Sequence, residues 1–129
     1  VDLLTNTLTE YQGFIKIVQV EQNSIGSVFY DMLVQKNPKI RIIRFLTTNK
    51  SKADIVNKLQ AALENEKIGL LKDDKLLNEL RLYEASYNPK TGNVSYNAPS
   101  GFNDDTCISL MLAYDALNTN KGTYNIAIK

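Results

Sequence analysis

The stretch that decides the fold is GFNDDTCISLMLA, which spans residues 101–113. Two adjacent carboxylates, Asp104 and Asp105, stand directly before a segment that is apolar on nearly every face of a helix. The pattern predicts a largely buried helix from Asp105 to about Leu117, because little room is left for a solvent-facing stripe. At its start, the helix dipole and the free backbone N–H groups favour ionised carboxylates. The pair is therefore a candidate ligand for a divalent cation, and the alternative is that one Asp only caps the helix.

Composition narrows the chemistry that this chain can perform. Its 129 residues are enough for one domain with its own core and too few for two. Fifteen Lys and Arg stand against 14 Asp and Glu, so the net charge of +1 neither demands nor excludes nucleic acid. The absence of histidine excludes Ser-His-Asp and Cys-His catalysis within the chain. No apolar run approaches the about 20 residues of a membrane span, so we expect no membrane partner.

Strand and helix patterns alternate ahead of the acidic pair. Apolar and β-branched runs predict strands, and helical spacing predicts helices, the third of which opens on Ser51 and Asp54 as a capping box. The expected helices are 2–11, 25–34, 51–65 and 74–80, and the expected strands are 14–20, 40–46, 82–87, 93–97 and 124–128. This order predicts an α/β fold with parallel strands, crossover helices and an added β-hairpin.

Glu21 is the second candidate site residue, because it directly follows the first predicted strand. Ligands of open α/β sheets gather outside the carboxyl ends of the strands. Together with the acidic pair, Glu21 would suit a two-metal site that activates water and stabilises the leaving oxygen of a phosphodiester. The alternative is an ordinary solvated strand end. Glu79 and Glu84 are interpreted as solvated or structural, and Asp73-Asp74 as another helix start.

Three segments together resemble the nuclease domain of the large terminase subunit of tailed bacteriophages. They are VEQNSIG at 20–26, the hairpin sequence LYEASYNPKTGNVSY at 82–96, and GFNDD at 101–105 before the apolar helix. The resemblance covers almost the whole chain. It implies an RNase H-like fold and an endonuclease that uses two Mg²⁺ or Mn²⁺ ions to cut concatemeric viral DNA during genome packaging.

The resemblance also implies site residues, partners and a location. Asp105 would be the principal metal ligand beside Glu21, while Asp104 would share the ion or cap the helix. The implied partners are double-stranded DNA, an ATPase domain of the same parent chain, the small terminase subunit and the portal. The implied location is the cytoplasm of a bacterial host that carries the phage or prophage.

Contact with DNA is expected from cations near the predicted loops and strands, where Lys and Arg would bind phosphates irrespective of sequence. The candidates are Arg41, Arg44, Lys50, Lys52 and Lys90. The alternative is that they are ordinary surface cations.

Two departures from the family pattern stand out. Asn103 occupies the place of the usual His before the acidic pair. The resemblance also implies a strand that carries a first metal-binding Asp, and we expect this strand to be missing upstream of residue 1. Residues 1–129 are therefore expected to form a single, partial RNase H-like domain, incomplete at its N-terminus. Two alternatives remain: another RNase H-like nuclease of the resolvase type, and a non-catalytic docking domain of the same fold.

The missing strand leads to a first prediction. The purified 129-residue chain should show weak or no nuclease activity, because a two-metal site needs several carboxylates to neutralise and hold its ions. Calorimetric titration with Mn²⁺ and a plasmid-nicking assay measure this. Robust Mn²⁺-dependent cutting by this chain would contradict it.

Overall fold

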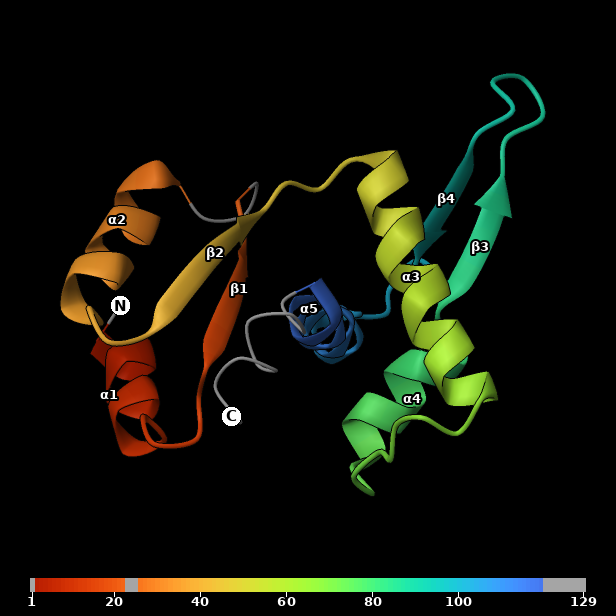
Figure 1. The fold of residues 1–129 in the computed structure, drawn as a ribbon. Coiled ribbons are helices and arrows are strands. Elements are labelled where there is room, and N and C mark those ends of the chain that lie inside the picture. Colours follow the sequence, from red (N-terminus) through yellow and green to blue (C-terminus); the bar gives the residue numbers. More distant parts are fainter. Residues whose placement is uncertain (1, 23–25, 120–129) are drawn as a thin grey trace. The chain divides into compact units, whose positions relative to one another are not determined.

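A computed structural model describes residues 2–22 and 26–119 of the chain. Its elements follow in the order α1 (Asp2–Glu10), β1 (Ile17–Glu21), α2 (Ser27–Lys36), β2 (Arg41–Phe45), α3 (Asn49–Glu64), α4 (Asp74–Leu82), β3 (Glu84–Tyr87), β4 (Val94–Asn97) and α5 (Asp105–Thr119) (Figure 1). The expected strand at 124–128 lies outside the described residues.

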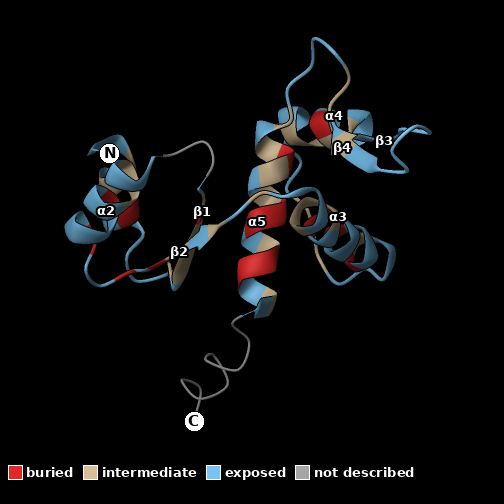
Figure 2. Cartoon of the chain, turned by 90° about the horizontal axis from the view of Figure 1, so that it is seen from above, coloured by how far each residue is buried: buried red, intermediate tan, exposed pale blue. Residues whose placement is uncertain are grey.

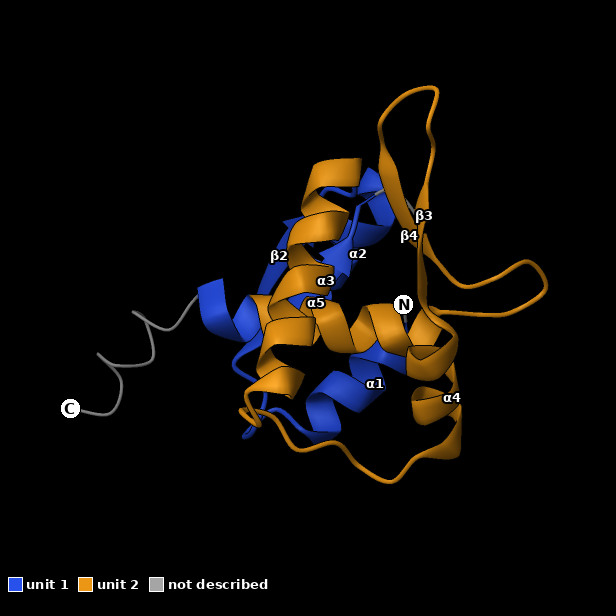
Figure 3. Ribbon diagram, turned by 90° about the vertical axis from the view of Figure 1, so that its right-hand side faces the viewer, with its two compact units in different colours: residues 1–47, 116–129 blue, residues 48–115 orange. Residues whose placement is uncertain are grey.

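Contacts divide the chain into two compact units (Figure 3). The first contains the chain up to Thr47 and the chain from Ala116 onward, and the second is Thr48–Asp115. The helix α5 thus contributes to both units. The single-domain expectation stays a prediction.

The first unit is built on a strand–helix–strand crossover. Strands β1 and β2 pair in parallel, from Ile17 opposite Arg41 to Glu21 opposite Phe45, and α2 connects them. This confirms the parallel pair and the crossover helix that the sequence predicted. Alternation along the strands directs apolar side chains to one core. That core contains Leu8, Val20, Leu33, Ile40 and Ile42.

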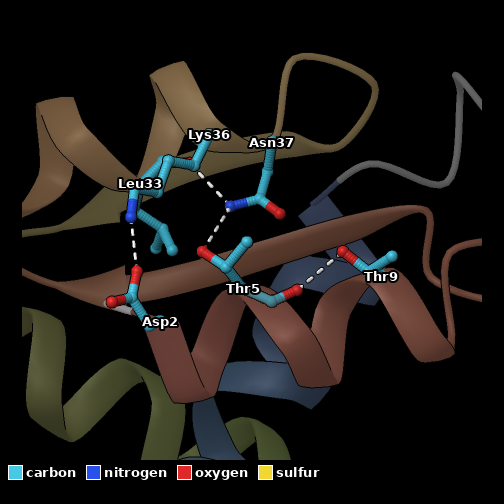
Figure 4. Close-up of polar contacts among 6 residues, drawn as sticks. All are labelled: Asp2, Thr5, Thr9, Leu33, Lys36 and Asn37. Carbon is cyan, nitrogen blue, oxygen red and sulfur yellow. Dashed lines mark hydrogen bonds and ion pairs between the residues drawn. The ribbon is translucent and has the colours of Figure 1, made fainter.

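A buried asparagine joins α1 to α2 in the first unit (Figure 4). The Asn37 side-chain amide donates to the Leu33 carbonyl at 2.8 Å and to the Thr5 hydroxyl at 3.3 Å. One turn before Thr5 in α1, Asp2 forms an ion pair with Lys36. The hydrogen bond from Lys36 is the main reason why the pKa of Asp2 is below its ordinary value. These contacts satisfy Asn37, whose burial would otherwise be unfavourable.

The second unit begins at the cap of α3. Thr48 is the N-cap: its hydroxyl accepts the Ser51 N–H at 3.0 Å, while the Ser51 hydroxyl accepts the Thr48 N–H at 2.8 Å. The expected capping box of Ser51 and Asp54 is therefore wrong by three residues, because Ser51 is the third residue of the helix. The helical spacing predicted an inward face of Ile55, Val56, Leu59, Ala62 and Leu63; the first four are buried, and Leu63 is half-buried.

The β-hairpin of the second unit confirms the predicted turn. Strands β3 and β4 pair antiparallel, from Glu84 opposite Asn97 to Tyr87 opposite Val94. Gly92 has φ = 73°, which favours glycine in the connecting turn. At its base, the Tyr83 hydroxyl donates to the Tyr96 carbonyl at 3.1 Å.

The helix α5 is buried along one face, whereas its sequence predicted burial on nearly all sides (Figure 2). Cys107, Met111, Leu112 and Ala116 are buried, while Leu117 is 50% exposed. The apolar composition of α5 does not determine which of its faces contacts other elements. The prediction from sequence therefore overestimated how much of the helix is buried. Within the described part of the chain, no helix combines the length and apolar character needed to cross a membrane.

Leu33 supports the core of the first unit, since its side chain is 0% exposed. We expect Leu33→Ala to lower the free energy of unfolding by about 2–5 kcal/mol, through lost burial and the cavity left behind. Leu3→Ala is the matched control, because Leu3 is also helical but 83% exposed. Chemical denaturation measures both, and equal effects would contradict this assignment of the core.

Candidate functional site

Glu21 is the last residue of β1 and faces Phe45 across the parallel pair. Its neighbour Val20 points into the core, so alternation turns the half-buried Glu21 carboxylate to the other face of the strand. The Thr47 hydroxyl donates a hydrogen bond to Glu21 Oε1 from just beyond β2. Glu21 is therefore held at the carboxyl edge of both strands, where the sequence placed it.

The acidic pair occupies the first turn of α5. Asp104 is the residue before the helix, and its carbonyl accepts the Ile108 N–H at 2.9 Å. Asp105 is the first helical residue. Asp104 is half-buried and Asp105 is exposed. An Asp in the position of Asp104 normally accepts the backbone N–H groups two or three residues later.

Those N–H groups are instead bound by Glu79, a residue of α4. Glu79 Oε2 accepts the Thr106 N–H at 2.7 Å and the Cys107 N–H at 3.1 Å, and also the Thr106 hydroxyl. Within residues 2–22 and 26–119, neither carboxylate of the pair takes part in a hydrogen bond or an ion pair. The side chains of Asp104 and Asp105 therefore do not cap α5.

A second Asp-Asp pair in the same unit shows the contrast. Asp73 precedes α4 and Asp74 begins it, so these two residues occupy the same helix positions as Asp104 and Asp105 do in α5. Here Asp73 Oδ1 accepts the Leu76 N–H at 2.8 Å, which is an ordinary N-cap. This confirms the prediction that Asp73-Asp74 is a helix start. Of two pairs at equivalent positions, only the one at α5 is left without a capping role.

Glu79 was interpreted from sequence as solvated or structural, and the structural interpretation is confirmed. Its side chain is 6% exposed. Hydrogen bonds, first from the Thr106 hydroxyl and then from the two amides, hold the pKa of this carboxyl below its ordinary value although burial opposes them. The capping role itself was missed. The signal in the sequence that could have revealed this role is the position of Glu79. It lies three residues after Leu76 and directly before Leu80, on the apolar side of α4.

The charge of Asp104 influences two neighbours. Burial, followed by the charge of Asp104, raises the pKa of the Cys107 thiol to about 11 and also raises the pKa of the Tyr83 hydroxyl. Both groups are therefore neutral near pH 7. Cys107 is 0% exposed, so its side chain packs in the interior.

The five candidate cations differ in their contacts. Arg44 pairs with Asp31 at 3.2 Å and lies over the Tyr30 ring at 4.0 Å. Lys52 donates to Asn97 Oδ1 at 2.9 Å. The side chains of the other three, Arg41, Lys50 and Lys90, are exposed and have no hydrogen-bond or ion-pair partner among the described residues.

The predicted metal ligands come from both units: Glu21 from the first and the acidic pair from the second. Among the described residues, no group of three or more His, Cys, Asp or Glu side chains is arranged to hold a metal ion. The shared site of Glu21 and Asp105 stays a prediction. What the structure describes is each half: a carboxylate at a strand end and a carboxylate pair at a helix start.

Solved structures share this fold. The crystal structure of the large terminase nuclease from thermophilic phage G20c matches with a TM-score of 0.73 and 20% sequence identity over 88% of this chain. The same nuclease with bound magnesium matches with a TM-score of 0.62 and 23% identity over 70% of this chain. This chain spans 59% and 47% of the lengths of those two chains. At these identities the likeness shows the fold alone.

The fold is therefore RNase H-like, as the sequence predicted. The family model described as the terminase RNaseH-like domain matches residues 8–117, and the chain belongs to that family. No curated protein matches the chain.

Proposed function

We propose that this chain is the nuclease part of a phage large terminase subunit, in which Glu21, Asp104 and Asp105 bind Mg²⁺ or Mn²⁺ for the hydrolysis of double-stranded DNA. The observation that carries the proposal is the state of the acidic pair. Glu79 caps α5, so two carboxylates at the helix start have no capping role. Membership of the terminase RNaseH-like family supplies the kind of chemistry that such a pair would serve.

The donor set fits a hard divalent cation. All three proposed ligands are carboxylates, whose oxygens are the ligands that Mg²⁺ and Mn²⁺ prefer. The large terminase nuclease of phage G20c was crystallised with bound magnesium, which is the same kind of ion. Such ions, when bound, would activate water and stabilise the charge that develops on the leaving oxygen. With no histidine in the chain, carboxylates and a metal are the available route to hydrolysis.

Each of the three proposed ligands has its own part in the site. Glu21 contributes its carboxylate from the end of β1, where the Thr47 hydroxyl restricts its orientation. Asp105 is fixed by the first turn of α5 and would be the principal ligand of the pair. Asp104 would share the ion. In the proposal, Glu21 and Asp105 face one site that contains two ions.

The proposed context is genome packaging. The family name supports a terminase role, and the substrate would be concatemeric viral DNA. The ATPase domain of the same parent chain, the small terminase subunit and the portal would be its partners. The reaction would take place in the cytoplasm of the bacterial host.

Asp105→Ala, made in the whole protein that contains this chain, should abolish cleavage of plasmid DNA in Mg²⁺ or Mn²⁺. The change removes a metal ligand, whereas even a lost Asp cap would cost only about 1 kcal/mol of stability. Asp74→Ala is the matched control, because Asp74 occupies the same position in α4. Plasmid nicking and thermal melting measure both variants. Retained cleavage by the Asp105 variant would remove Asp105 from the site.

Lys50 and Lys90 are the proposed phosphate contacts of the second unit. The double variant Lys50→Ala/Lys90→Ala should bind DNA more weakly for all sequences, and the dependence of log affinity on log salt should fall by about 1 per lost contact. Arg44→Ala is the comparison, because Asp31 and Tyr30 already engage that guanidinium. Binding of labelled duplex DNA at several salt concentrations measures the slopes. An unchanged slope in the double variant would make these lysines ordinary surface cations.

A further inference from the structure

Glu79 satisfies the start of a helix that belongs to another part of the sequence. Its acceptor oxygen lies 27 and 28 residues before the donors Thr106 and Cys107. The first turn of any helix leaves N–H groups unsatisfied, and the nearest acceptor is normally the side chain of the residue before the helix. At α5 that residue is Asp104. Glu79 has taken its place.

The burial of Glu79 makes this arrangement specific. The side chain is 6% exposed, and all three hydrogen bonds converge on Oε2. Its other oxygen, Oε1, has no hydrogen-bond partner within the described residues. A buried carboxylate needs such partners to offset its desolvation. The first turn of α5 and the Glu79 carboxylate therefore depend on each other.

We propose that Glu79 is a positioning residue: by accepting the Thr106 and Cys107 amides, it leaves Asp104 free to bind a divalent cation beside Asp105. Without Glu79, the unsatisfied amides would recruit the Asp104 carboxylate as an ordinary N-cap. The Asp104 side chain would then turn toward these amides, which would remove it as a metal ligand and reorient the start of the helix. The Asp73 cap of α4 shows what an Asp does at this position when no outside acceptor is present. This inference rests on the proposed metal site.

Residues that orient metal ligands without touching the ion commonly alter affinity when they are replaced. Such changes typically weaken metal binding or activity by about 10–100-fold. Replacement of Glu79 by Ala should weaken metal binding by a factor within this range. Glu79→Gln retains an accepting oxygen of nearly the same reach, so it should restore most of the affinity that Glu79→Ala loses. Glu79→Asp retains the charge and loses one methylene of reach.

The test measures Mn²⁺ binding by calorimetry, and hydrogen exchange of the Thr106 and Cys107 amides, in the whole protein. The variants are Glu79→Ala, Glu79→Gln and Glu79→Asp, with Asp73→Ala as the matched control. The control removes a helix cap from α4, which carries no proposed metal ligand. A melting curve for each variant shows whether it folds, and binding is compared only among those that do.

We expect Glu79→Ala to weaken Mn²⁺ binding at least about tenfold, with Gln restoring most of it and Asp73→Ala leaving it unchanged. Should the Ala variant fail to fold, weaker binding by a folded Asp variant gives the same support. Binding equal to wild type in the folded Ala or Asp variant overturns the positioning role. An equal loss of Mn²⁺ affinity in the Asp73→Ala control also overturns the positioning role. Absence of Mn²⁺ binding by the wild-type protein overturns the proposed function itself, and the positioning role with it.

Discussion

The hydrogen bonds from the first turn of α5 to Glu79 are the interaction on which the acidic pair depends. A helix start must satisfy its free N–H groups, and a local Asp is the simplest acceptor. Here the acceptor comes from α4, so it joins two helices of the second unit as well as capping one of them. Because Glu79 caps the helix, the Asp104 and Asp105 carboxylates remain at the helix start without a capping role.

The other half of the proposed site depends on a different constraint. In the first unit, a parallel strand pair requires a crossover helix, and α2 provides it. The parallel register brings the ends of β1 and β2 to one edge, and Thr47 lies there beside Glu21. Strand alternation separates the core side of β1 from the side that carries Glu21. The position of Glu21 is thus a consequence of topology, and the Thr47 hydroxyl adds the orientation.

Periodic features of this fold could be predicted from sequence, whereas features that depend on a distant partner could not. The apolar face of α3, the turn at Gly92 and the parallel pair all have local patterns. Arg44 was predicted as a DNA contact without its partners, because Tyr30 and Asp31 lie on α2. The cap of α3 was misplaced because Thr48 and Ser51 are both good N-cap residues, and only their reciprocal hydrogen bonds distinguish them.

The acidic pair illustrates the same limit at the site. Its place before a helix was plain from sequence, but whether it capped that helix was not, because both Asp-Asp pairs of the chain have the same local pattern. Whether Asp104 caps α5 is determined by Glu79, whose carboxylate accepts the Thr106 N–H although the two residues are 27 positions apart in sequence. Its position beside Leu76 and Leu80 was a clue that it would be buried. Burial alone, however, does not specify which amides it would meet.

The use of Glu79 as a cap has a physical cost that a local Asp cap avoids. A buried carboxylate must be desolvated, which is unfavourable unless hydrogen bonds compensate for it. Hydrogen bonds to Oε2 offset the desolvation, but they leave Oε1 without a partner among the described residues. Asp73 meets the same need at α4 with one exposed side chain. A fold optimised for stability alone would repeat that solution at α5. The less favourable cap at α5 accords with the proposed site, in which the Asp104 and Asp105 carboxylates stay available for a cation, because functional sites often reduce stability.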